Sequence, residues 1–234
     1  MKIAILADVH ANICALEAVI NDCTRQSVEH FLVAGDLVGY YYWPHEVVQR
    51  LMSDSRITCI RGNHEDMLAE AIRNDAAAKR YRQKYGSGFD VCRSLMSDTE
   101  MRWLLNLPAN VQLSLGGVQF SVHHGSPEAI DEYVYPDSSA EDLARCYTDA
   151  YCTILGHTHH PFMHHDSSRI LLNPGSVGQP RDLGGYASFA TFDTANGAVQ
   201  FKRVPFDTNV IIDAVKAKDP KLQYLQKIMT RGLA

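Results

Sequence analysis

The amino-acid sequence predicts an α/β fold, and three observations support this prediction. In the first sixty residues, short apolar runs typical of buried strands alternate with segments whose apolar residues recur at helical spacing. The second half contains several short strand-like runs that are separated by turn-forming residues. The composition, with 46% hydrophobic and 21% charged residues, is ordinary for a globular protein. We therefore expect residues 1–234 to form one α/β domain with two strand-rich halves.

The first part of the chain is expected to form a β-α-β-α-β unit. Leu16 and Val19 belong to a row of apolar residues at helical spacing, and Pro44 suits the first turn of the second helix. Alternation of this kind implies parallel strands with helices packed against them. The expected strands are residues 2–7, 30–34 and 57–60, and the expected helices are residues 11–24 and 44–52.

Residues 66–107 are expected to form a helical insertion. Their apolar residues recur at helical spacing, with breaks near Asn74 and at Gly86–Gly88. Six basic residues lie between Arg73 and Arg93. This basic segment is interpreted either as a solvated helix face or as a lid that meets substrate phosphates.

Beyond residue 107 the sequence is rich in strand-like runs. Gly116-Gly117 and Asn196-Gly197 are turn dipeptides, and each joins two such runs. Asp219-Pro220 is expected to start a C-terminal helix. The expected strands are residues 111–115, 118–122, 153–155, 162–164, 170–172, 186–192 and 199–204.

Composition and charge argue against several classes of protein. No apolar stretch approaches the roughly 18–20 residues that span a bilayer, so we expect no membrane partner. The net charge of −5 argues against a protein that coats nucleic acid. None of the six cysteines forms a C-x-x-C pair, and the first residues do not resemble a signal peptide. We interpret the cysteines as reduced core residues of a cytoplasmic protein.

Metal-binding residue types follow shortly after five of the expected strands. In α/β sheets, ligands gather beyond the carboxyl ends of the strands, so five loops can converge on one crevice. Taken singly, Asp8 could cap a helix and Asn63 could belong to a turn. Five such loops in succession make coincidence a poor explanation. The motifs are Asp8-x-His10, Gly35-Asp36, Gly62-Asn63-His64-Glu65, His123-His124-Gly125 and Gly156-His157-Thr158-His159.

These residue types indicate a site for divalent transition metals. Asp, Asn and imidazole are borderline-to-hard ligands that suit Mn²⁺, Fe, Zn²⁺ or Ni²⁺, and no thiol lies among them. Seven such groups exceed what one ion needs. A shared carboxylate could hold two ions roughly 3.5–4 Å apart, which is the arrangement that clamps the attacking and leaving oxygens in phosphoryl transfer.

The ordered series of motifs over residues 8–159 resembles the calcineurin-like metallophosphoesterase superfamily. The motifs GNHE and GHTH are together highly specific, whereas D-x-H alone is weak. The segment Asn173–Arg181 resembles a stretch of the small bacterial and archaeal members, which include predicted phosphodiesterases and diadenosine-tetraphosphatase-like enzymes. The resemblance implies an α/β (α+β) fold, namely a four-layer αββα sandwich of two mixed β-sheets flanked by helices.

The resemblance also implies the roles of the ligands. His124 directly precedes Gly125, as the family's ligand does, and it is therefore favoured over His123. Manganese is the ion expected first, with iron, zinc, nickel and cobalt as alternatives. Seven residues are assigned to two divalent ions: Asp8, His10 and His159 to one, Asn63, His124 and His157 to the other, with Asp36 bridging both.

The activity that the resemblance implies is hydrolysis of a phosphodiester or phosphoanhydride in a small phosphorylated substrate, such as a nucleotide. A hydroxide that bridges the two ions would attack phosphorus in line with the departing oxygen. His64 would be catalytic, because it would face the phosphate, stabilise the developing charge and protonate the leaving oxygen. The alternatives are a phosphomonoesterase with the same site and a non-catalytic scaffold that retains the fold. The oligomeric state is left open.

Three further residues are candidates for binding the substrate. The aromatic run Tyr40–Trp43 replaces a glycine-containing segment of small family members, and its residues Tyr41 and Trp43 could stack on a nucleobase. The alternative is a loop that packs on the neighbouring helix. Arg181 follows a turn-rich loop and could bind phosphate through two nitrogens, or it could be an ordinary surface residue.

Overall fold

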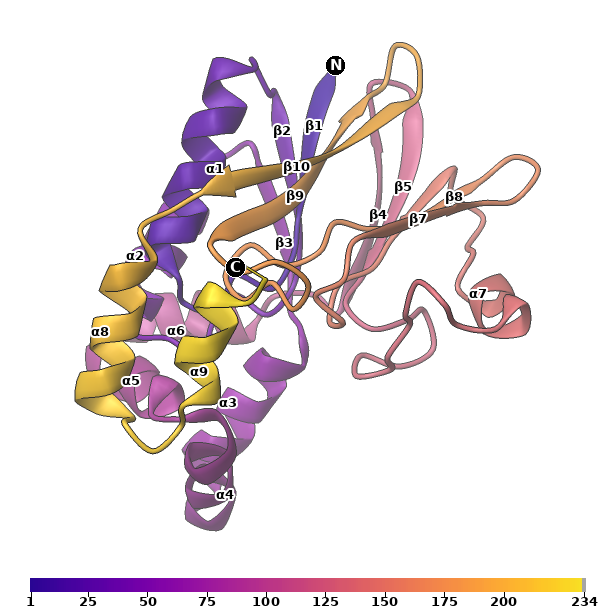
Figure 1. Ribbon diagram of the computed structural model, residues 1–234. Coiled ribbons are helices and arrows are strands. Elements are labelled where there is room, and N and C mark those ends of the chain that lie inside the picture. Colours follow the sequence, from indigo (N-terminus) through magenta and orange to yellow (C-terminus); the bar gives the residue numbers. More distant parts are fainter. Residues whose placement is uncertain (233–234) are drawn as a thin grey trace.

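The computed structural model describes residues 1–232, and these form two five-stranded sheets that face each other (Figure 1). The first sheet has the strand order β10-β9-β1-β2-β3. Strands β1, β2 and β3 are parallel, as the β-α-β-α-β prediction requires, and β9 and β10 add an antiparallel edge. Its strands are β1 (Lys2–Leu6), β2 (His30–Ala34), β3 (Ile57–Ile60), β9 (Tyr186–Asp193) and β10 (Ala198–Pro205).

The second sheet has the strand order β4-β5-β6-β8-β7 and is also mixed. The predicted hairpin at Gly116-Gly117 joins β4 to β5, and β5, β6 and β8 run parallel. Each predicted strand of this half lies within two residues of its expected bounds. The strands are β4 (Asn110–Leu115), β5 (Val118–His123), β6 (Cys152–Ile154), β7 (Phe162–His165) and β8 (Ile170–Asn173).

The main core lies between the two sheets. Strand β1 is apolar on both faces: Ile3 and Ile5 point toward the second sheet, whereas Ala4 and Leu6 belong to the cluster under the helices. The rings of Phe120 on β5 and Phe192 on β9 meet edge to face across the gap, with their centroids 5.1 Å apart. The packing of the sheets therefore depends on side chains separated by most of the chain.

Helices cover the outer face of the first sheet (Figure 1). Helices α1, α2, α5 and α6 bury apolar residues against it, including Leu16 and Val48. Helix α3 begins at Asn63 rather than near residue 66, because the Glu65 side chain accepts a hydrogen bond from the Gly62 N–H. The helices are α1 (Ile13–Arg25), α2 (Pro44–Met52), α3 (Asn63–Arg73), α4 (Asp75–Tyr85), α5 (Gly88–Leu95) and α6 (Asp98–Leu105).

The outer face of the second sheet is covered by the loop after β5 and by helix α7 (Ala140–Arg145). Val134 in this loop and Leu143 in α7 pack against Phe162 and Leu171 of the sheet. Helix α7, which follows the Ser139 N-cap, is not among the expected elements. With it, the layers are helix, sheet, sheet and helix, so the predicted four-layer sandwich is confirmed.

The prediction that Asp219-Pro220 starts a C-terminal helix is wrong. Helix α8 (Thr208–Lys218) ends at this pair, and Asp219 has φ −135° and ψ 56°. A residue before proline avoids the helical region, so the pair stops a helix instead of starting one. Asp207 caps the start of α8 through its side chain. The chain continues through α9 (Tyr224–Lys227) and a 3₁₀ turn at Ile228–Thr230.

All six cysteines carry free thiols, and five of them are buried, as predicted. No helix within residues 1–232 is both long enough and apolar enough to cross a membrane. The assignment of residues 1–234 to one domain, and of residues 66–107 to an insertion, stays a prediction.

The contact between Phe120 and Phe192 can be tested by unfolding measurements. Phe120→Ala should lower the free energy of unfolding by about 3–5 kcal/mol, because it leaves a cavity between the sheets. A double-mutant cycle with Phe120→Leu and Phe192→Leu should give a coupling of about 0.5–1.5 kcal/mol. The control is Phe201→Ala on β10, where the ring is 42% exposed and the change should stay within about 0.5 kcal/mol. A coupling near zero would contradict the assignment.

Candidate metal centre

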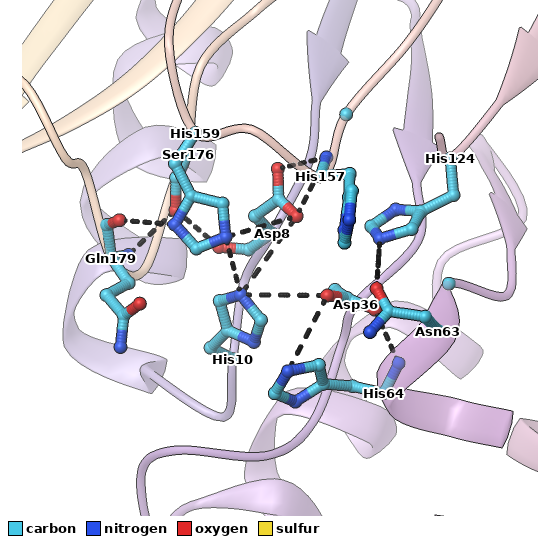
Figure 2. Close-up of polar contacts among 12 residues, drawn as sticks. Asp8, His10, Asp36, Asn63, His64, His124, His157, His159, Ser176 and Gln179 are labelled. Atoms are coloured by element: carbon cyan, nitrogen blue, oxygen red, sulfur yellow. Dashed lines mark hydrogen bonds and ion pairs between the residues drawn. The ribbon is translucent and has the colours of Figure 1, made fainter. Parts of the chain in front are cut away.

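The seven predicted ligands meet in one buried cluster (Figure 2). They follow β1, β2, β3, β5 and β6, in loops or, for Asn63, at the first residue of α3, so the carboxyl ends of strands from both sheets contribute. The largest exposed fraction among them is 8%, at Asn63. Their close approach depends on the packing of one sheet on the other, because neither sheet carries the whole set.

The first group consists of Asp8, His10 and His159. The Nε2 atoms of the two histidines lie 3.1 Å apart, and Nε2 of His159 lies 3.5 Å from Asp8 Oδ1. Each imidazole contacts a backbone carbonyl through Nδ1, at Val38 for His10 (3.3 Å) and at Gln179 for His159 (2.6 Å). A carbonyl only accepts, so the proton is assigned to Nδ1 and the lone pairs of both Nε2 atoms face each other.

The second group consists of Asp36, His124 and His157, with Asn63 beside them. Nε2 of His124 lies 2.9 Å from Asn63 Oδ1 and 3.2 Å from Asp36 Oδ1. Nδ1 of His124 contacts the carbonyl of Ala34 at 2.7 Å, which again directs Nε2 into the cluster. Nε2 of His157 is buried without a hydrogen-bond partner. An unpartnered buried nitrogen is costly unless something binds it.

Asp36 lies between the two halves of the cluster and faces both. Its Oδ2 faces His10 Nε2 at 3.8 Å, whereas its Oδ1 faces His124 Nε2 at 3.2 Å (Figure 2). Oδ1 also accepts a hydrogen bond from the backbone N–H of His64 at 2.8 Å. The two carboxylate oxygens thus point to different groups, which is the geometry of a bridging ligand.

The distances fit divalent ions. Two ligand nitrogens that are each about 2.1 Å from one ion, at angles between octahedral and tetrahedral, lie roughly 3.0–3.4 Å apart. The separation of 3.1 Å between His10 and His159 falls in this range. Without a cation, facing lone pairs repel and the His157 nitrogen lacks a partner. The donor set therefore fits metal binding on the geometry of its own atoms.

Five of the seven ligands have a left-handed backbone conformation. A non-glycine residue with positive φ is uncommon, and each such residue costs of order 1–3 kcal/mol. This backbone conformation directs the side chains into the cluster, whereas a regular strand or helix would direct them elsewhere. The residues and their φ values are Asp8 (57°), His10 (51°), Asp36 (55°), His157 (67°) and His159 (62°).

Burial keeps most imidazoles of the cluster neutral. It lowers the pKa of His157 to about 4 and holds the pKa values of His10 and His159 well below the ordinary value. Near neutral pH these three rings therefore carry free lone pairs, and no proton has to leave them before an ion binds.

The protonation of the other groups of the cluster depends on the two carboxylates, Asp8 and Asp36. Burial, reinforced by Asp36, raises the pKa of Asp8 to about 8. Burial would also raise the pKa of Asp36, but His124 and His64 outweigh it and hold that pKa well below its usual range. Burial alone would lower the pKa of His124, but Asp36 raises it to about 10. A bound divalent ion would take the place of the protons on Asp8 and His124.

Glu65 holds the loops that carry the second group. Its buried carboxylate accepts hydrogen bonds from the backbone N–H groups of Asp36 (3.0 Å), Leu37 (2.9 Å), Val38 (3.2 Å) and Gly62 (2.7 Å). It thereby fixes the turn after β2 against the start of α3. The sequence motif GNHE thus supplies a candidate ligand, a candidate catalytic histidine and the support of both.

The segment that follows β8 supports the first group. Ser176 donates from Oγ to the backbone carbonyl of Asp8 at 2.8 Å, and Asn173 donates from Nδ2 to the carbonyl of Gly156 at 2.6 Å. Gln179 accepts from His159, as described above. The predicted motif from Asn173 to Arg181 therefore lies beside the loops of Asp8 and His159.

His64 lies next to the cluster, in the first turn of α3. Its Nε2 is 4.0 Å from Asp36 Oδ2, and its Nδ1 is buried without a partner. With His10 and Asp36 it also forms a third group that could hold an ion. His123, by contrast, belongs to no such group in residues 1–232 and contacts Ser121 Oγ at 2.8 Å.

A small cavity of about 150 Å³ opens onto the cluster. Among the three predicted substrate-binding residues, Arg181 lines it. Tyr41 and Trp43 do not. Tyr40, the first residue of the aromatic run, does. The lining residues are Asp36, Asn63, His64, His157 and His159 of the cluster, with Tyr40, Lys84, Tyr85, Tyr133 and Arg181 around them.

The rest of the aromatic run holds the C-terminal segment. Tyr41 is fully buried and donates from its hydroxyl to the carbonyl of Leu225 at 3.3 Å, and Tyr42 donates to Asp219 at 2.8 Å. Trp43 packs against the same apolar cluster as Tyr41. These three residues thus belong to a packed loop, which was the alternative to base stacking. The loop packs mainly on the C-terminal helices instead of on the neighbouring helix.

Lys84 and Arg181 bring positive charge to the cavity. Arg80 and Arg82, which precede Lys84 on α4, form ion pairs with Glu70 and Asp90. No carboxylate within residues 1–232 forms an ion pair with Lys84 or Arg181, and both residues line the cavity. The sequence prediction placed Lys84 in a basic run without singling it out. Its position at the end of α4, two residues before Gly86, is the local signal that separates it from the rest.

Comparison with known proteins identifies relatives over most of the chain. Residues 1–197 match the model of the calcineurin-like phosphoesterase superfamily domain. The uncharacterized protein MJ0912 of Methanocaldococcus jannaschii is 30% identical over 223 residues, which cover 88% of each chain. The crystal structure of a metallophosphoesterase from Sphaerobacter thermophilus is similar with a TM-score of 0.79 and 28% identity over 98% of each chain.

A second solved structure shows the same fold. The hypothetical protein PH1004 from Pyrococcus horikoshii OT3 is similar with a TM-score of 0.82 and 23% identity, over 99% of this chain and 98% of that one. The likeness extends over the C-terminal helices, which lie beyond the residues that match the family model.

The role of Asp36 can be tested by metal analysis. After loading with Mn²⁺ and desalting, we expect two ions per parent chain by elemental analysis. Asp36→Asn should retain at most one, because the substituted amide lacks the negative charge that both groups share. His123→Ala is the control, since His123 belongs to no candidate group and this variant should keep both ions. An Asp36→Asn protein that binds as much Mn²⁺ as the parent would contradict the bridging role.

Proposed function

The chain belongs to the calcineurin-like phosphoesterase superfamily and is a metal-dependent phosphoester hydrolase, and from this premise we propose that it uses two divalent ions to cleave a phosphodiester or phosphoanhydride bond. The observation that carries the proposal is that the cluster divides into two groups, and that Asp36 of the second group also faces His10 of the first at 3.8 Å. One ion would bind to Asp8, His10 and His159, and the other to Asn63, His124 and His157, with Asp36 between them.

The residues around the cavity would bind and orient the phosphoryl group. When bound, the two ions would supply Lewis acidity and an activated water that attacks phosphorus in line. Arg181 and Lys84 would contact the non-bridging oxygens, because both cations line the cavity and lack a carboxylate partner in the described chain. The protein's part is position and charge, which suits phosphoryl transfer, where the reaction asks little covalent chemistry of the side chains.

His64 would act on the phosphate instead of on a metal. It lines the cavity, and its Nε2 lies 4.0 Å from Asp36 Oδ2, beside the place where the phosphoryl group would bind. Stabilisation of that charge, or protonation of the leaving oxygen, typically contributes a factor of 10²–10⁴ to the rate.

Manganese is the ion that we propose first, because the donor set contains carboxylate, amide and imidazole groups but no thiolate. A cytoplasmic location is proposed on the six free cysteines, since thiols stay reduced in that compartment. A phosphomonoesterase is the alternative activity, and the substrate test below separates the two.

Metal removal tests the activity. Chelation should abolish turnover, and added Mn²⁺ should restore it, when bis(p-nitrophenyl) phosphate and p-nitrophenyl phosphate are assayed side by side. A preference for the diester supports the proposed reaction, whereas a preference for the monoester supports the phosphomonoesterase. If neither ester is turned over in a metal-dependent way, the chain is a scaffold and the proposal is wrong.

The role of His64 has a separate test. His64→Ala should lower kcat by about 10²–10⁴ and keep the metal content of the parent. His123→Ala serves as the matched control, because its imidazole lies outside the cavity and both quantities should be unchanged. A parallel loss of metal and activity in His64→Ala would show that His64 is a ligand, as its group with His10 and Asp36 allows.

A further inference from the structure

The cavity beside the metal cluster is too small to enclose a whole organic phosphate of drug or nucleotide size. Its volume is about 150 Å³, whereas pockets that enclose a drug-sized ligand measure roughly 300–1,000 Å³. Residues of the cluster form its floor, so the phosphoryl group must lie inside. The organic part of a substrate must then extend through the mouth, and the side chains at the mouth decide which organic group is favoured.

Two tyrosines form a platform at this mouth. Tyr133 lines the cavity, and its ring centroid lies 4.1 Å from that of His157. Tyr135 stacks on Tyr133 with an interplanar angle of 10° and a centroid distance of 5.9 Å. Tyr133 is 52% exposed and Tyr135 is 37% exposed. The pair therefore runs outward from the cluster and presents aromatic surface to solvent.

The chain holds this platform in place by burying the residue between the two rings. Val134 is 3% exposed and packs with Leu155, Phe162 and Leu171 on the outer face of the second sheet. In an extended segment, neighbouring residues point to opposite sides, so the anchor of Val134 turns both tyrosines away from the core. Figure 1 shows the loop between β5 and α7, which carries them, below the strands, at the same end of the sheets as α3 and α4.

Positive charge and a third tyrosine lie around the same cavity. Lys84 and Tyr85 come from the end of α4, with the Lys84 Nζ 4.8 Å from the Tyr85 ring centroid. Two C-terminal residues fix the backbone here: Tyr224 donates to the carbonyl of Lys84 at 2.8 Å, and Arg231 donates to the carbonyl of Arg181 at 2.6 Å. Both cations are thus held at the cavity in the structure.

We infer that the natural substrate is a nucleotide whose base stacks on the Tyr133–Tyr135 platform while its phosphoryl group lies in the cavity with Arg181 and Lys84. The inference rests on the proposed phosphoesterase function and names the substrate class of that site. The two rings are offset-stacked, so the base adds to their exposed surface and does not insert between them. Stacking tolerates any base, because every base has a π-face, so the platform selects nucleotides over sugar phosphates without choosing among bases.

Binding of two matched ligands tests the platform without turnover. The first is the AMP analogue in which a methylene group replaces the 5′ oxygen, and the second is the corresponding ribose phosphonate without adenine. Neither contains a hydrolysable ester. Calorimetry on the Mn²⁺-loaded protein should give a Kd about 5- to 150-fold lower for the nucleotide analogue, which is the range of base–aromatic stacking.

Substitutions locate this preference. Tyr135→Ala should reduce the logarithm of the ratio of the two Kd values by at least half. The Kd of the ribose phosphonate should stay unchanged in this variant. Tyr135→Phe should keep the parent ratio. Tyr133→Ala should have the larger effect, and its metal content is measured as well because Tyr133 contacts His157. Tyr151→Ala is the control, since this tyrosine is 41% exposed but lines a different pocket with Asn196 and Gly197.

Two outcomes would overturn the inference: a parent ratio near 1, or a ratio that both alanine variants leave unchanged. The p-nitrophenyl ester assays separate this failure from that of the proposed function. Metal-dependent turnover with a Kd ratio near 1 rejects the platform alone. A high ratio that depends on Tyr135, together with no turnover of any ester, rejects the enzymatic proposal and leaves a nucleotide-binding site.

Discussion

The rest of the site depends on the contacts that the Asp36 carboxylate makes with both halves of the cluster. One oxygen faces His10 from the loop after β1, and the other faces His124 from the second sheet. Because Asp36 itself follows β2, it joins three loops and both sheets at one point. The cluster buries two imidazole lone pairs that face each other, on His10 and His159, and a nitrogen of His157 that has no hydrogen-bond partner. A bound cation would remove the repulsion between the lone pairs and give the His157 nitrogen a partner.

Such a cluster exists because the surrounding structure holds it. Left-handed backbone at five ligands costs free energy, and the sheet-to-sheet core around Phe120 and Phe192 and the four hydrogen bonds to Glu65 offset that cost. The seven candidate metal ligands all lie within residues 1–197, the part that matches the family model. The segment beyond it contributes differently, because Tyr224 and Arg231 hold the backbone of the two cations at the cavity.

Much of the fold follows from local sequence. Apolar runs and turn dipeptides predict the strands of both sheets, and Pro44 marks the start of α2. The errors lie in the helical segments. Asp219-Pro220 stops a helix where a start was expected, and α7 is a helix of six residues whose apolar contacts are with the second sheet. Periodicity within so short a segment carries little information, so tertiary packing decides it.

The sequence by itself determined the set of candidate ligand types, their order and their position near strand ends, because the chemistry of metal binding requires those types and each one lies shortly after the end of its strand. Only the tertiary structure decided which aromatic residues meet the site. Tyr41 and Trp43 lie close to Asp36 along the chain but pack on the C-terminal segment, while Tyr133, nearly a hundred residues from Asp36, lines the cavity. The physical reason is that a ring is buried or presented by its contacts across the fold, and those contacts join residues that the sequence keeps far apart.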